Sequence, residues 1–506
     1  MYHLRRAGSD HFLVGAMDDD ILRELWRREI PCFQMASGLT TRDFGWGTPT
    51  FHKMGRSKIE LIGLFVEQGF DILLSDVDTV WMRDPLPYMA RFPNADVLTS
   101  SDHLATTVRD DGLEKWPGAS SAANIGIMLF RSTAGAKELA KEWMKVLEKD
   151  AKVWDQNAFN DLFRRGNRPS TSKDRTFSCY SGKCTCGILN VASFGSGHTF
   201  FVQRQYEAVP HEPYVLHATF QFSGTEGKRH RMREAELWLD PPEYYDPPGG
   251  LLVYTPTWMV PTGKIKMLPR EKVAAKKVAT DTHFALVHYQ LGELRRAMAL
   301  AGALGRTLVL PPLLCGYDRW WAPHTGKIPG SGSWTLPFLC PADHVLDLPP
   351  MLGALKGQNG MPKGLREYTM LQHEHLPHQV AASRQLITAG KAGSSLPPSD
   401  ALEKAAKAPS STTALPVPSG LTPDELAKAL GTLQDVKVLD MGNLTALALQ
   451  NPPDSFIQRT KNFGSIWCCV FDHPGHIWYD PLFDIVPHKD RHGRTYSDKW
   501  EARSGP

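Results

Sequence analysis

The stretch Gly69-Phe-Asp-Ile-Leu-Leu-Ser-Asp-Val-Asp-Thr-Val-Trp81 reads as a short apolar strand that ends in two aspartates. The predicted strand runs from Phe70 to Leu74, and Asp76 and Asp78 follow it. Because strand side chains alternate between two faces, residues two apart point the same way, and we expect these carboxylates to share a ligand. Carboxylate oxygens suit Mg²⁺ or Mn²⁺, and these ions suit a diphosphate. The stretch therefore favours an enzyme that handles nucleotide-sugars.

An Asp-x-Asp triplet is weak evidence by itself, because a chain of this length contains about one or two by chance. A second triplet, Asp18-Asp19-Asp20, precedes a predicted amphipathic helix, where capping and the helix dipole account for the acids. What favours the triplet at 76–78 is its context, an apolar strand before it and Trp81-Met-Arg-Asp-Pro85 after it.

Length and composition are those of a globular protein of two or three domains. The chain has 506 residues, of which 42% are hydrophobic and 22% charged, so a sizeable core is available. A net charge of +3 argues against a dedicated nucleic-acid binder, and the basic run 264–277 is typical of a solvated linker helix. Without a run of about eighteen apolar residues or a signal-like start, we expect no membrane segment in these residues and a soluble chain.

Cysteine usage does not indicate a disulfide scaffold, since eight cysteines are few for this length. Cys179, Cys184 and Cys186 lie close together but lack a Cys-x-x-Cys hairpin. A local disulfide or free thiols are therefore favoured over a structural zinc site. Cys468 and Cys469 follow an apolar run and read as core residues.

The first half of the chain alternates strand-like and helix-like segments, which predicts a largely parallel sheet covered by helices. The predicted strands are residues 12–16, 32–35, 70–74, 95–99 and 125–130, and the predicted helices are residues 20–29, 55–68, 134–150 and 154–165.

A second α/β region follows a Pro/Gly-rich linker that begins at residue 241. Its predicted strand–helix–strand start includes residues 283–289, 291–304 and 306–310 and could open another nucleotide-fold-like domain. The Ala-, Ser- and Pro-rich segment at about 388–420 is predicted to be a disordered insertion.

A third metal ligand and a phosphate-binding loop are predicted near residues 214–231. His217 ends a short apolar strand and could complete a metal set with Asp78. Gly224 and Gly227 would let backbone amides approach a phosphate, and Lys228 would neutralise it. The alternative is a surface loop with a satisfied histidine.

Two further segments carry polar groups suited to a sugar. Asn124 and Gly126 precede an apolar strand and suit contact with sugar hydroxyls, or form an ordinary turn. Asp155 and Gln156 open a helix, where Asp155 is either an N-cap or an acid that faces the anomeric carbon.

Two cations begin the second predicted helix. Arg56 and Lys58 could reach a diphosphate or an acceptor. As exposed helix cations they need no such function.

Taken together and in this order, these motifs resemble glycosyltransferase family 77, and more narrowly the plant and green-algal arabinosyltransferases that extend arabinose chains on hydroxyproline-rich, extensin-type wall proteins. The motifs of the first half are Gly45-Trp-Gly47, Lys53-Met-Gly-Arg-Ser-Lys58, Ser75-Asp-Val-Asp78, Ala123-Asn-Ile-Gly126, Asp155-Gln156 and His217 with Gly224-Thr-Glu-Gly-Lys-Arg-His-Arg-Met-Arg-Glu234. The segments 308–321 and 337–344 extend the resemblance into the second half.

The resemblance implies an α/β fold, a GT-A nucleotide-diphospho-sugar transferase domain (Rossmann-like, with a mixed sheet) in residues 1–240. A linker (241–280) and a C-terminal α/β domain (281–506) would follow. It implies Mn²⁺ (or Mg²⁺) and a UDP-sugar donor, UDP-β-L-arabinofuranose, used with retention. The implied metal ligands are Asp76, Asp78 and His217; the donor-binding residues are Asp76, Asp78, Arg56, Lys58, Asn124, Gly126, Gly227 and Lys228; the catalytic candidates are Asp155 and Gln156.

The resemblance also implies a hydroxyproline-rich glycoprotein acceptor and a Golgi, type II membrane setting. It further implies a membrane anchor and a first strand that contacts the uridine, neither of which we identify in these residues. Two alternatives remain open, a non-catalytic GT-A-fold homologue that binds glycans or acts as a scaffold, and a nucleotidyltransferase.

Overall fold

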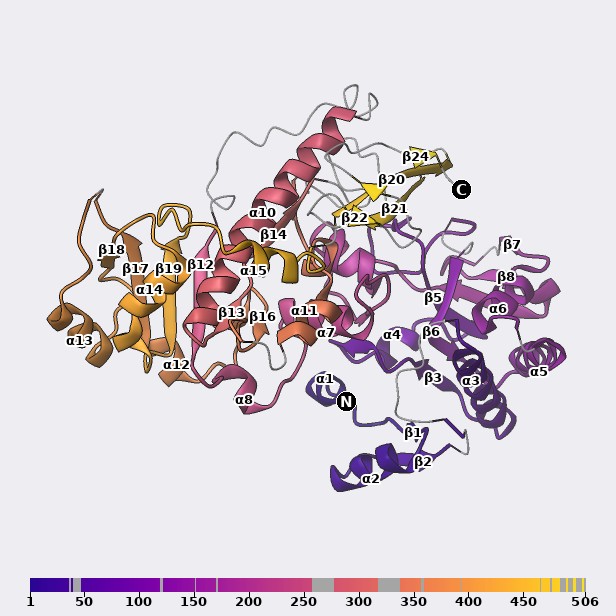
Figure 1. Cartoon of the computed structure of the whole chain (residues 1–506). Helices are drawn as coiled ribbons and strands as arrows, with labels where there is room; N and C mark the ends of the chain where they lie inside the picture. The colour runs from indigo at the N-terminus through magenta and orange to yellow at the C-terminus, as the bar shows by residue number, and fades with distance from the viewer. Residues whose placement is uncertain are drawn as a thin grey trace. The chain divides into compact units, whose positions relative to one another are not determined.

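The computed structural model divides into two compact units, with the division between Phe220 and Gln221, and each unit is described by itself (Figure 1). For residues 277–285 and for those from 466 onwards, only the backbone is described. The structure describes residues 1–35, 38–39, 47–118, 122–150, 152–169, 172–256, 277–316, 337–355, 359–391, 393–464, 466–473, 476–482, 488–489, 495–496 and 503–504.

The first unit begins with a small β–α–β element after helix α1 (Tyr2–Arg6). Strand β1 (Val14–Ala16) and strand β2 (Cys32–Gln34) pair in parallel, and helix α2 (Asp19–Arg27) connects them. The Asp18 side chain caps α2 by accepting a hydrogen bond from the Ile21 amide, 2.9 Å. The capping interpretation of this second Asp-x-Asp triplet is therefore confirmed.

The main sheet of the first unit is mixed and has the strand order β3-β6-β5-β9-β8-β7. Only the β5–β9 pairing is parallel. The expectation of a largely parallel sheet is therefore wrong, because β8 and β9 form a hairpin and β5 reaches β6 without a helical crossover. The strands are β3 (Ile72–Ser75), β5 (Val97–Ser101), β6 (Ala123–Phe130), β7 (Arg168–Pro169), β8 (Phe177–Cys179) and β9 (Cys184–Ile188).

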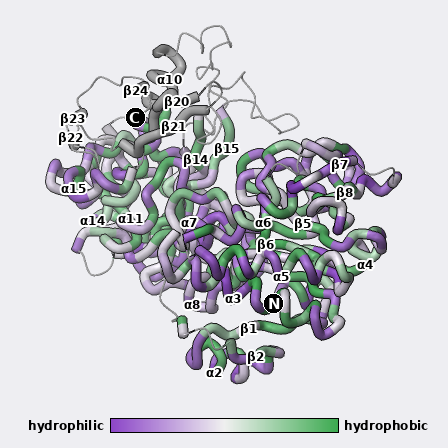
Figure 2. Tube along the Cα trace, turned by 90° about the vertical axis from the view of Figure 1, so that its right-hand side faces the viewer, coloured by the Kyte–Doolittle hydropathy of each residue, from purple (hydrophilic) through white to green (hydrophobic). Residues whose placement is uncertain are grey.

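Three helices cover one face of this sheet, and their apolar stripes explain why. Helix α3 (Pro49–Glu67) contributes Ile59, Ile62 and Val66 to a core that it shares with α5 (Ala134–Lys149), α6 (Asp155–Arg164) and β6. Figure 2 shows β6 as a hydrophobic segment, in keeping with its being buried along its whole length.

A three-stranded sheet of order β10-β11-β4 contributes to the core of the opposite face. Strand β4 (Thr79–Trp81) pairs antiparallel with β11 (Val215–His217), and β10 (Phe194–Ser196) pairs in parallel with β11. Together with Tyr88 of α4 (Leu86–Met89), aromatic residues of this region pack on Leu98, Ile127 and Leu129 of the main sheet. This arrangement brings the end of β11 beside the start of β4.

The second unit contains a six-stranded sheet in which every pairing is parallel. Its order is β16-β13-β12-β19-β17-β18, and the strand labels follow this order across Figure 1. The strands are β12 (Leu251–Thr255), β13 (Thr307–Val309), β16 (Leu365–Arg366), β17 (Arg384–Ala389), β18 (Leu415–Val417) and β19 (Val438–Asn443). The helices of this unit are α7 (Gly224–Glu234), α8 (Pro242–Tyr245), α10 (Lys277–Ala303), α11 (Leu348–Leu355), α12 (His378–Ala382), α13 (Ser399–Lys407), α14 (Pro423–Ala429) and α15 (Asp454–Arg459).

The predicted disordered insertion at about 388–420 is wrong, because this segment supplies α13 and β18. Its alanines have high helix propensity, and Leu402 and Ala405 bury one side of α13. The Pro/Gly linker at 241–250 instead contains α8 and leads directly into β12. Residues 264–276 of the basic run 264–277 lie outside the described residues, and residue 277 begins α10.

Disulfides occur in both units. Cys179 pairs with Cys186 and Cys184 is a buried free thiol, so a disulfide and not a zinc site occupies the first cysteine cluster. In the second unit Cys315 of β14 (Leu313–Cys315) pairs with Cys340 of β15 (Phe338–Cys340). The side chains of residues 468 and 469 lie outside the described part of the chain. No helix among the described residues has the length and apolarity that crossing a bilayer requires.

Candidate functional site

The Asp76-Val-Asp78 triplet forms a tight turn between β3 and β4. The Asp76 carbonyl accepts hydrogen bonds from the Thr79 amide, 3.3 Å, and from the Thr79 hydroxyl, 2.7 Å. The Val77 side chain, at the tip of the turn, is 98% exposed. The two carboxylates do lie on one side, but a turn brings them there and not the strand alternation that we expected.

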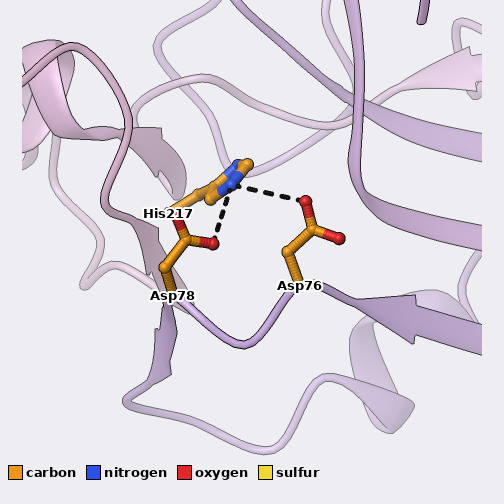
Figure 3. A group of neighbouring side chains, drawn as sticks. All are labelled: Asp76, Asp78 and His217. Carbon is orange, nitrogen blue, oxygen red and sulfur yellow. Dashed lines mark ion pairs between the residues drawn. The ribbon is translucent and has the colours of Figure 1, made fainter. Parts of the chain in front are cut away.

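His217 lies beside this turn because β11 and β4 are antiparallel and pair His217 with Thr79. The Ala218 amide also donates to the Asp78 carbonyl, 2.9 Å. The His217 Nε2 atom is 3.3 Å from Asp78 Oδ1 and 3.8 Å from Asp76 Oδ2, as Figure 3 shows. One ligand atom from each of the three residues lies within 4.8 Å of the others. The structure therefore brings together the three residues that the sequence predicted as a metal set.

Gly126 of β6 provides the space for the His217 ring. A Cβ atom on Gly126 would lie 2.1 Å from Cε1 of His217, a distance that no side chain tolerates. The Gly126 carbonyl accepts a hydrogen bond from the Asp76 amide, 2.8 Å, which extends the β3–β6 ladder to the turn. Any larger residue at position 126 would displace the imidazole.

Lys58 of α3 neutralises part of the acidic cluster. Its Nζ atom donates to Asp76 Oδ1, 2.9 Å, and to the Ile125 carbonyl, 3.3 Å. Burial lowers the pKa of Lys58, but the carboxylates of Asp76 and Asp155 outweigh burial and raise it. Lys58 is therefore a cation held beside the Asp76 carboxylate.

Burial also lowers the pKa of His217, and the hydrogen bond and charge of Asp78 outweigh this effect and raise it. The electrostatic balance of the cluster thus favours positive charge between its carboxylates, from an imidazolium or from a bound cation.

A second polar group forms where β5 ends, and sequence reasoning missed its central residue, Asp102. The Asp102 carboxylate accepts hydrogen bonds from two side-chain amides, from Asn124 Nδ2, 2.9 Å, and from Gln156 Nε2, 3.0 Å. The side-chain oxygen Oδ1 of Asn124 accepts from the backbone amide of Gly126, 2.8 Å. Burial raises the pKa of Asp102, and the hydrogen bond from Gln156 offsets part of this. The signal available in the sequence was a carboxylate directly after a strand in Ser100-Ser-Asp102, the same signal as at Asp76.

Asp155 is the first residue of α6 and not its N-cap, which is Trp154. The Asp155 side chain is buried and accepts from the Gln156 amide, 2.9 Å. A Cβ atom on Gly55 of α3 would lie 2.6 Å from Asp155 Oδ2, so these helices are in close contact at Gly55. Burial raises the pKa of Asp155, while the charge of Lys58 opposes this.

The three other predicted donor-binding residues, Arg56, Gly227 and Lys228, lie on helices α3 and α7. Arg56 lies two positions before Lys58 on α3, and residues two apart on a helix do not face the same side. Gly227 and Lys228 belong to α7 of the second unit, and this segment is a helix where we expected a loop. The Gly227 amide donates to the Ser223 carbonyl, 3.0 Å, so it is used within the helix. The roles of all three residues stay predictions.

The arrangement as a whole combines two chemistries. One cluster, Asp76, Asp78, His217 and Lys58, offers hard oxygen and imidazole ligands next to a cation, which suits a divalent ion and a diphosphate. The other, centred on Asp102, offers a carboxylate and amide groups, which suit hydroxyls. Gly126 belongs to β6 and links the two clusters.

Comparison with known proteins also indicates a protein that handles nucleotide-sugars. Residues 7–232 match the family model described as nucleotide-diphospho-sugar transferase. The chain is similar to Arabinosyltransferase XEG113 of Arabidopsis thaliana, with 41% identity over 495 residues that cover 96% of this chain and 74% of that protein. It is also similar to Beta-arabinofuranosyltransferase RAY1 of the same plant, with 30% identity over 107 residues that cover 21% of this chain and 20% of that protein.

Among solved structures, that of mouse xyloside xylosyltransferase 1 in its apo form matches over 41% of this chain and 84% of that chain. The identity is 12% and the TM-score is 0.24.

Proposed function

This chain belongs to the nucleotide-diphospho-sugar transferase family, and on that basis we propose that it is a metal-dependent glycosyltransferase that transfers L-arabinofuranose from UDP-L-arabinofuranose. The observation that carries the proposal is the cluster of Asp76, Asp78 and His217, whose ligand atoms lie within 4.8 Å of one another, with Lys58 against Asp76. Two carboxylates and an imidazole fit Mn²⁺, with Mg²⁺ as the alternative.

In this proposal Asp76, Asp78 and His217 would hold the ion. Asp76 and Asp78 lie in the turn between β3 and β4, and the pairing of β11 with β4 brings His217 beside them. A divalent ion at such a place neutralises the charge that develops on a leaving diphosphate. Gly126 leaves room for the His217 ring, and Lys58 keeps the Asp76 carboxylate oriented through its 2.9 Å contact. These residues are ready before the substrate arrives, which lowers the cost of reorganisation during the reaction.

We assign the sugar to the Asp102 cluster. Asp102 accepts hydrogen bonds, and Asn124 and Gln156 can each offer amide groups to hydroxyls of the donor sugar. Asp155 and Gln156 are our candidates for the sugar face opposite the leaving group in a retaining transfer. The raised pKa of the buried Asp155 means that its carboxyl retains its proton to a higher pH than an exposed aspartate does.

The donor and acceptor are proposed from the relatives. The names of both cited relatives specify transfer of arabinose or arabinofuranose. The resemblance to the extensin-type group supplies the acceptor, arabinosylated hydroxyproline-rich glycoprotein.

A Golgi location is part of the proposal. The Cys179–Cys186 and Cys315–Cys340 disulfides support it, because disulfides persist in the secretory pathway and are rare in the cytosol.

The test is turnover of UDP-L-arabinofuranose on an arabinosylated hydroxyproline peptide, with Mn²⁺ and with EDTA. We expect turnover only with the metal, and we expect Asp78→Ala to lower kcat/KM by about 100-fold or more, because a bound ion contributes several kcal/mol to the transition state. The matched control is Asp20→Ala, which removes an exposed carboxylate from the other Asp-x-Asp triplet and should leave turnover unchanged.

Two outcomes would count against the proposal. Equal rates for Asp78→Ala and the parent chain would remove the metal assignment. Binding of UDP and Mn²⁺ in calorimetry without any turnover, on every arabinosylated acceptor tried, would favour the non-catalytic homologue.

A further inference from the structure

The parallel sheet of the second unit has a reversal in its strand order between β12 and β19. From β12 the chain adds β13 and then β16 on one side, and afterwards it places β17, β18 and β19 on the other side. In open parallel sheets ligands bind outside the carboxyl ends of the strands at such a switch point. The topology therefore selects the ends of β12 and β19 as the place to search.

A cavity of about 290 Å³ lies at this place. Leu444, Thr445, Ala448 and Leu449, which line one part of it, follow directly after the last residue of β19. Glu293 and Arg296 of α10, which connects β12 to β13, complete the lining. The volume is at the lower end of ligand pockets, which range over about 300–1,000 Å³.

Glu293 is the polar centre of this cavity. It is 1% exposed, and its Oε1 atom accepts hydrogen bonds from the Tyr289 hydroxyl, 3.2 Å, and from the Thr445 hydroxyl. Tyr289 lies one helical turn before Glu293 on α10, and this residue is 45% exposed. Arg296, one turn later, donates to Asn451 at the surface, 3.1 Å. One face of α10 thus carries an aromatic ring, a carboxylate and a cation.

Tyr254, near the end of β12, adds a buried hydroxyl. The β12–β19 register shifts between Val253 and Thr255, so Tyr254 lies at an irregularity of the strand. Tyr254 is 7% exposed, and within the described residues its hydroxyl makes no hydrogen bond. Burial raises the pKa of Tyr254, and the Glu293 charge adds to this, which indicates that the two side chains are near each other. A buried hydroxyl without a partner is costly, and a ligand hydroxyl would satisfy it.

The chemistry of the lining selects the kind of ligand. A buried carboxylate repels phosphate, and among the described residues Arg296 is the only cation that lines the cavity, so a nucleotide diphosphate is disfavoured. The Glu293 carboxylate and the Thr445 hydroxyl line the cavity, and the Tyr289 and Tyr254 side chains lie beside Glu293. These hydroxyls, the carboxylate and the ring of the exposed residue Tyr289 match the hydroxyls and the apolar C–H face of a neutral sugar.

We propose that the second unit carries a separate binding site for a short neutral saccharide at the β12–β19 switch point, formed by Glu293, Thr445, Tyr254 and Tyr289. The identity of that saccharide as an arabinofuranosyl chain of the acceptor rests on the proposed function, whereas the site itself rests on the topology and the lining. At this site the second unit binds the glycan of the acceptor.

The experiment is saturation-transfer NMR and calorimetry of the full chain with an L-arabinofuranose disaccharide, without UDP or Mn²⁺. Binding should weaken at least tenfold in Tyr254→Phe and in Glu293→Gln. Tyr254→Phe is the sharper variant, because it removes one hydroxyl that makes no hydrogen bond in the described structure and should fold at least as well as the parent. Glu403→Gln on α13, whose carboxylate is exposed, is the control and should bind as the parent does.

UDP–Mn²⁺ affinity, measured in parallel, separates this proposal from the proposed function. We expect it to be unchanged in Tyr254→Phe. The saccharide site is wrong if both variants bind the disaccharide as the parent does, if no disaccharide binding is seen, or if UDP competes with the disaccharide. Saccharide binding that is sensitive to Tyr254→Phe in a chain without transferase turnover would retain the site and reject only the enzymatic assignment.

Discussion

The two units use charged residues in opposite ways. In the first unit the side chains of Asp76 and Asp78 are 30% and 22% exposed and lie around a turn. In the second unit Arg231 of α7 and Asp343 form an ion pair, 2.9 Å between Nε and Oδ1, with side chains that are 1% and 0% exposed. An acidic cluster open to solvent can exchange its partner for a ligand, whereas a closed pair cannot. Exposure, and not charge alone, therefore separates a binding cluster from a structural one.

The largest effect is expected at the closed pair. Asp343→Asn leaves the Arg231 guanidinium buried without its counter-charge, which should lower the free energy of unfolding of the second unit by about 3–5 kcal/mol. Hydrogen exchange of peptides from the second unit measures this separately from the first unit. A loss below about 1 kcal/mol, the value of a surface pair, would contradict our description of the pair as buried.

The same pair predicts a pH dependence. Burial raises the pKa of Asp343, but Arg231 and His344 outweigh burial and hold it well below its ordinary value. The unfolded chain therefore binds the proton more readily, so this stabilisation is fully present above pH of about 4 and is lost as the pH falls further. The loss should be absent in Asp343→Asn.

The next effect concerns the Asp102 cluster. Asp102→Asn places an amide opposite the amides of Asn124 and Gln156, so one of the two hydrogen bonds is lost. A hydrogen bond to a charged group contributes about 1.5–3 kcal/mol, and we expect kcat/KM to fall by about 10–100-fold while Mn²⁺ affinity stays unchanged. Asp110→Asn, at an exposed pair with Arg175, is the control. An unchanged kcat/KM would exclude Asp102 from the site.

Two glycines of α3 differ in what an added Cβ atom would contact. Gly55→Ala would place a Cβ atom 2.6 Å from Asp155 Oδ2, whereas Gly63→Ala meets nothing within 4 Å. Alanine in a helix is favoured over glycine by about 1 kcal/mol, so Gly63→Ala should stabilise the first unit. Overpacking should make Gly55→Ala about 1–3 kcal/mol less stable than Gly63→Ala. Chemical denaturation gives both values, and equal stabilities would contradict the close contact.

The smallest effect is expected at the capped triplet. Asp18→Ala removes the hydrogen bond to the Ile21 amide and should reduce the stability of α2 by about 1 kcal/mol without changing turnover. Faster hydrogen exchange across residues 19–27 is the measurement. A loss of activity would instead indicate that this triplet takes part in the site.

Much of the fold was predictable because local sequence patterns determine where many of its helices form. The amphipathic spacing of Ile59, Ile62 and Val66 predicted α3, and the helices at 134–150 and 154–165 correspond to α5 and α6. The direction of strand pairing was not predictable, because hairpins and crossovers depend on which strands meet. The sequence predicts a loop at residues 224–234 because of its two glycines, but the other residues of this segment favour a helix, and the segment forms α7.

Residues that are neighbours along the chain already specify that two carboxylates follow an apolar strand and that a histidine ends another. They also specify the cap of α2, since a cap involves only neighbours along the chain. Only the tertiary structure decided that Asp102 joins Asn124 and Gln156, that Gly126 leaves room for His217, and that β12 and β19 lie side by side. These contacts join residues that are 22 or more positions apart, and such contacts depend on strand register and packing, which no local pattern encodes.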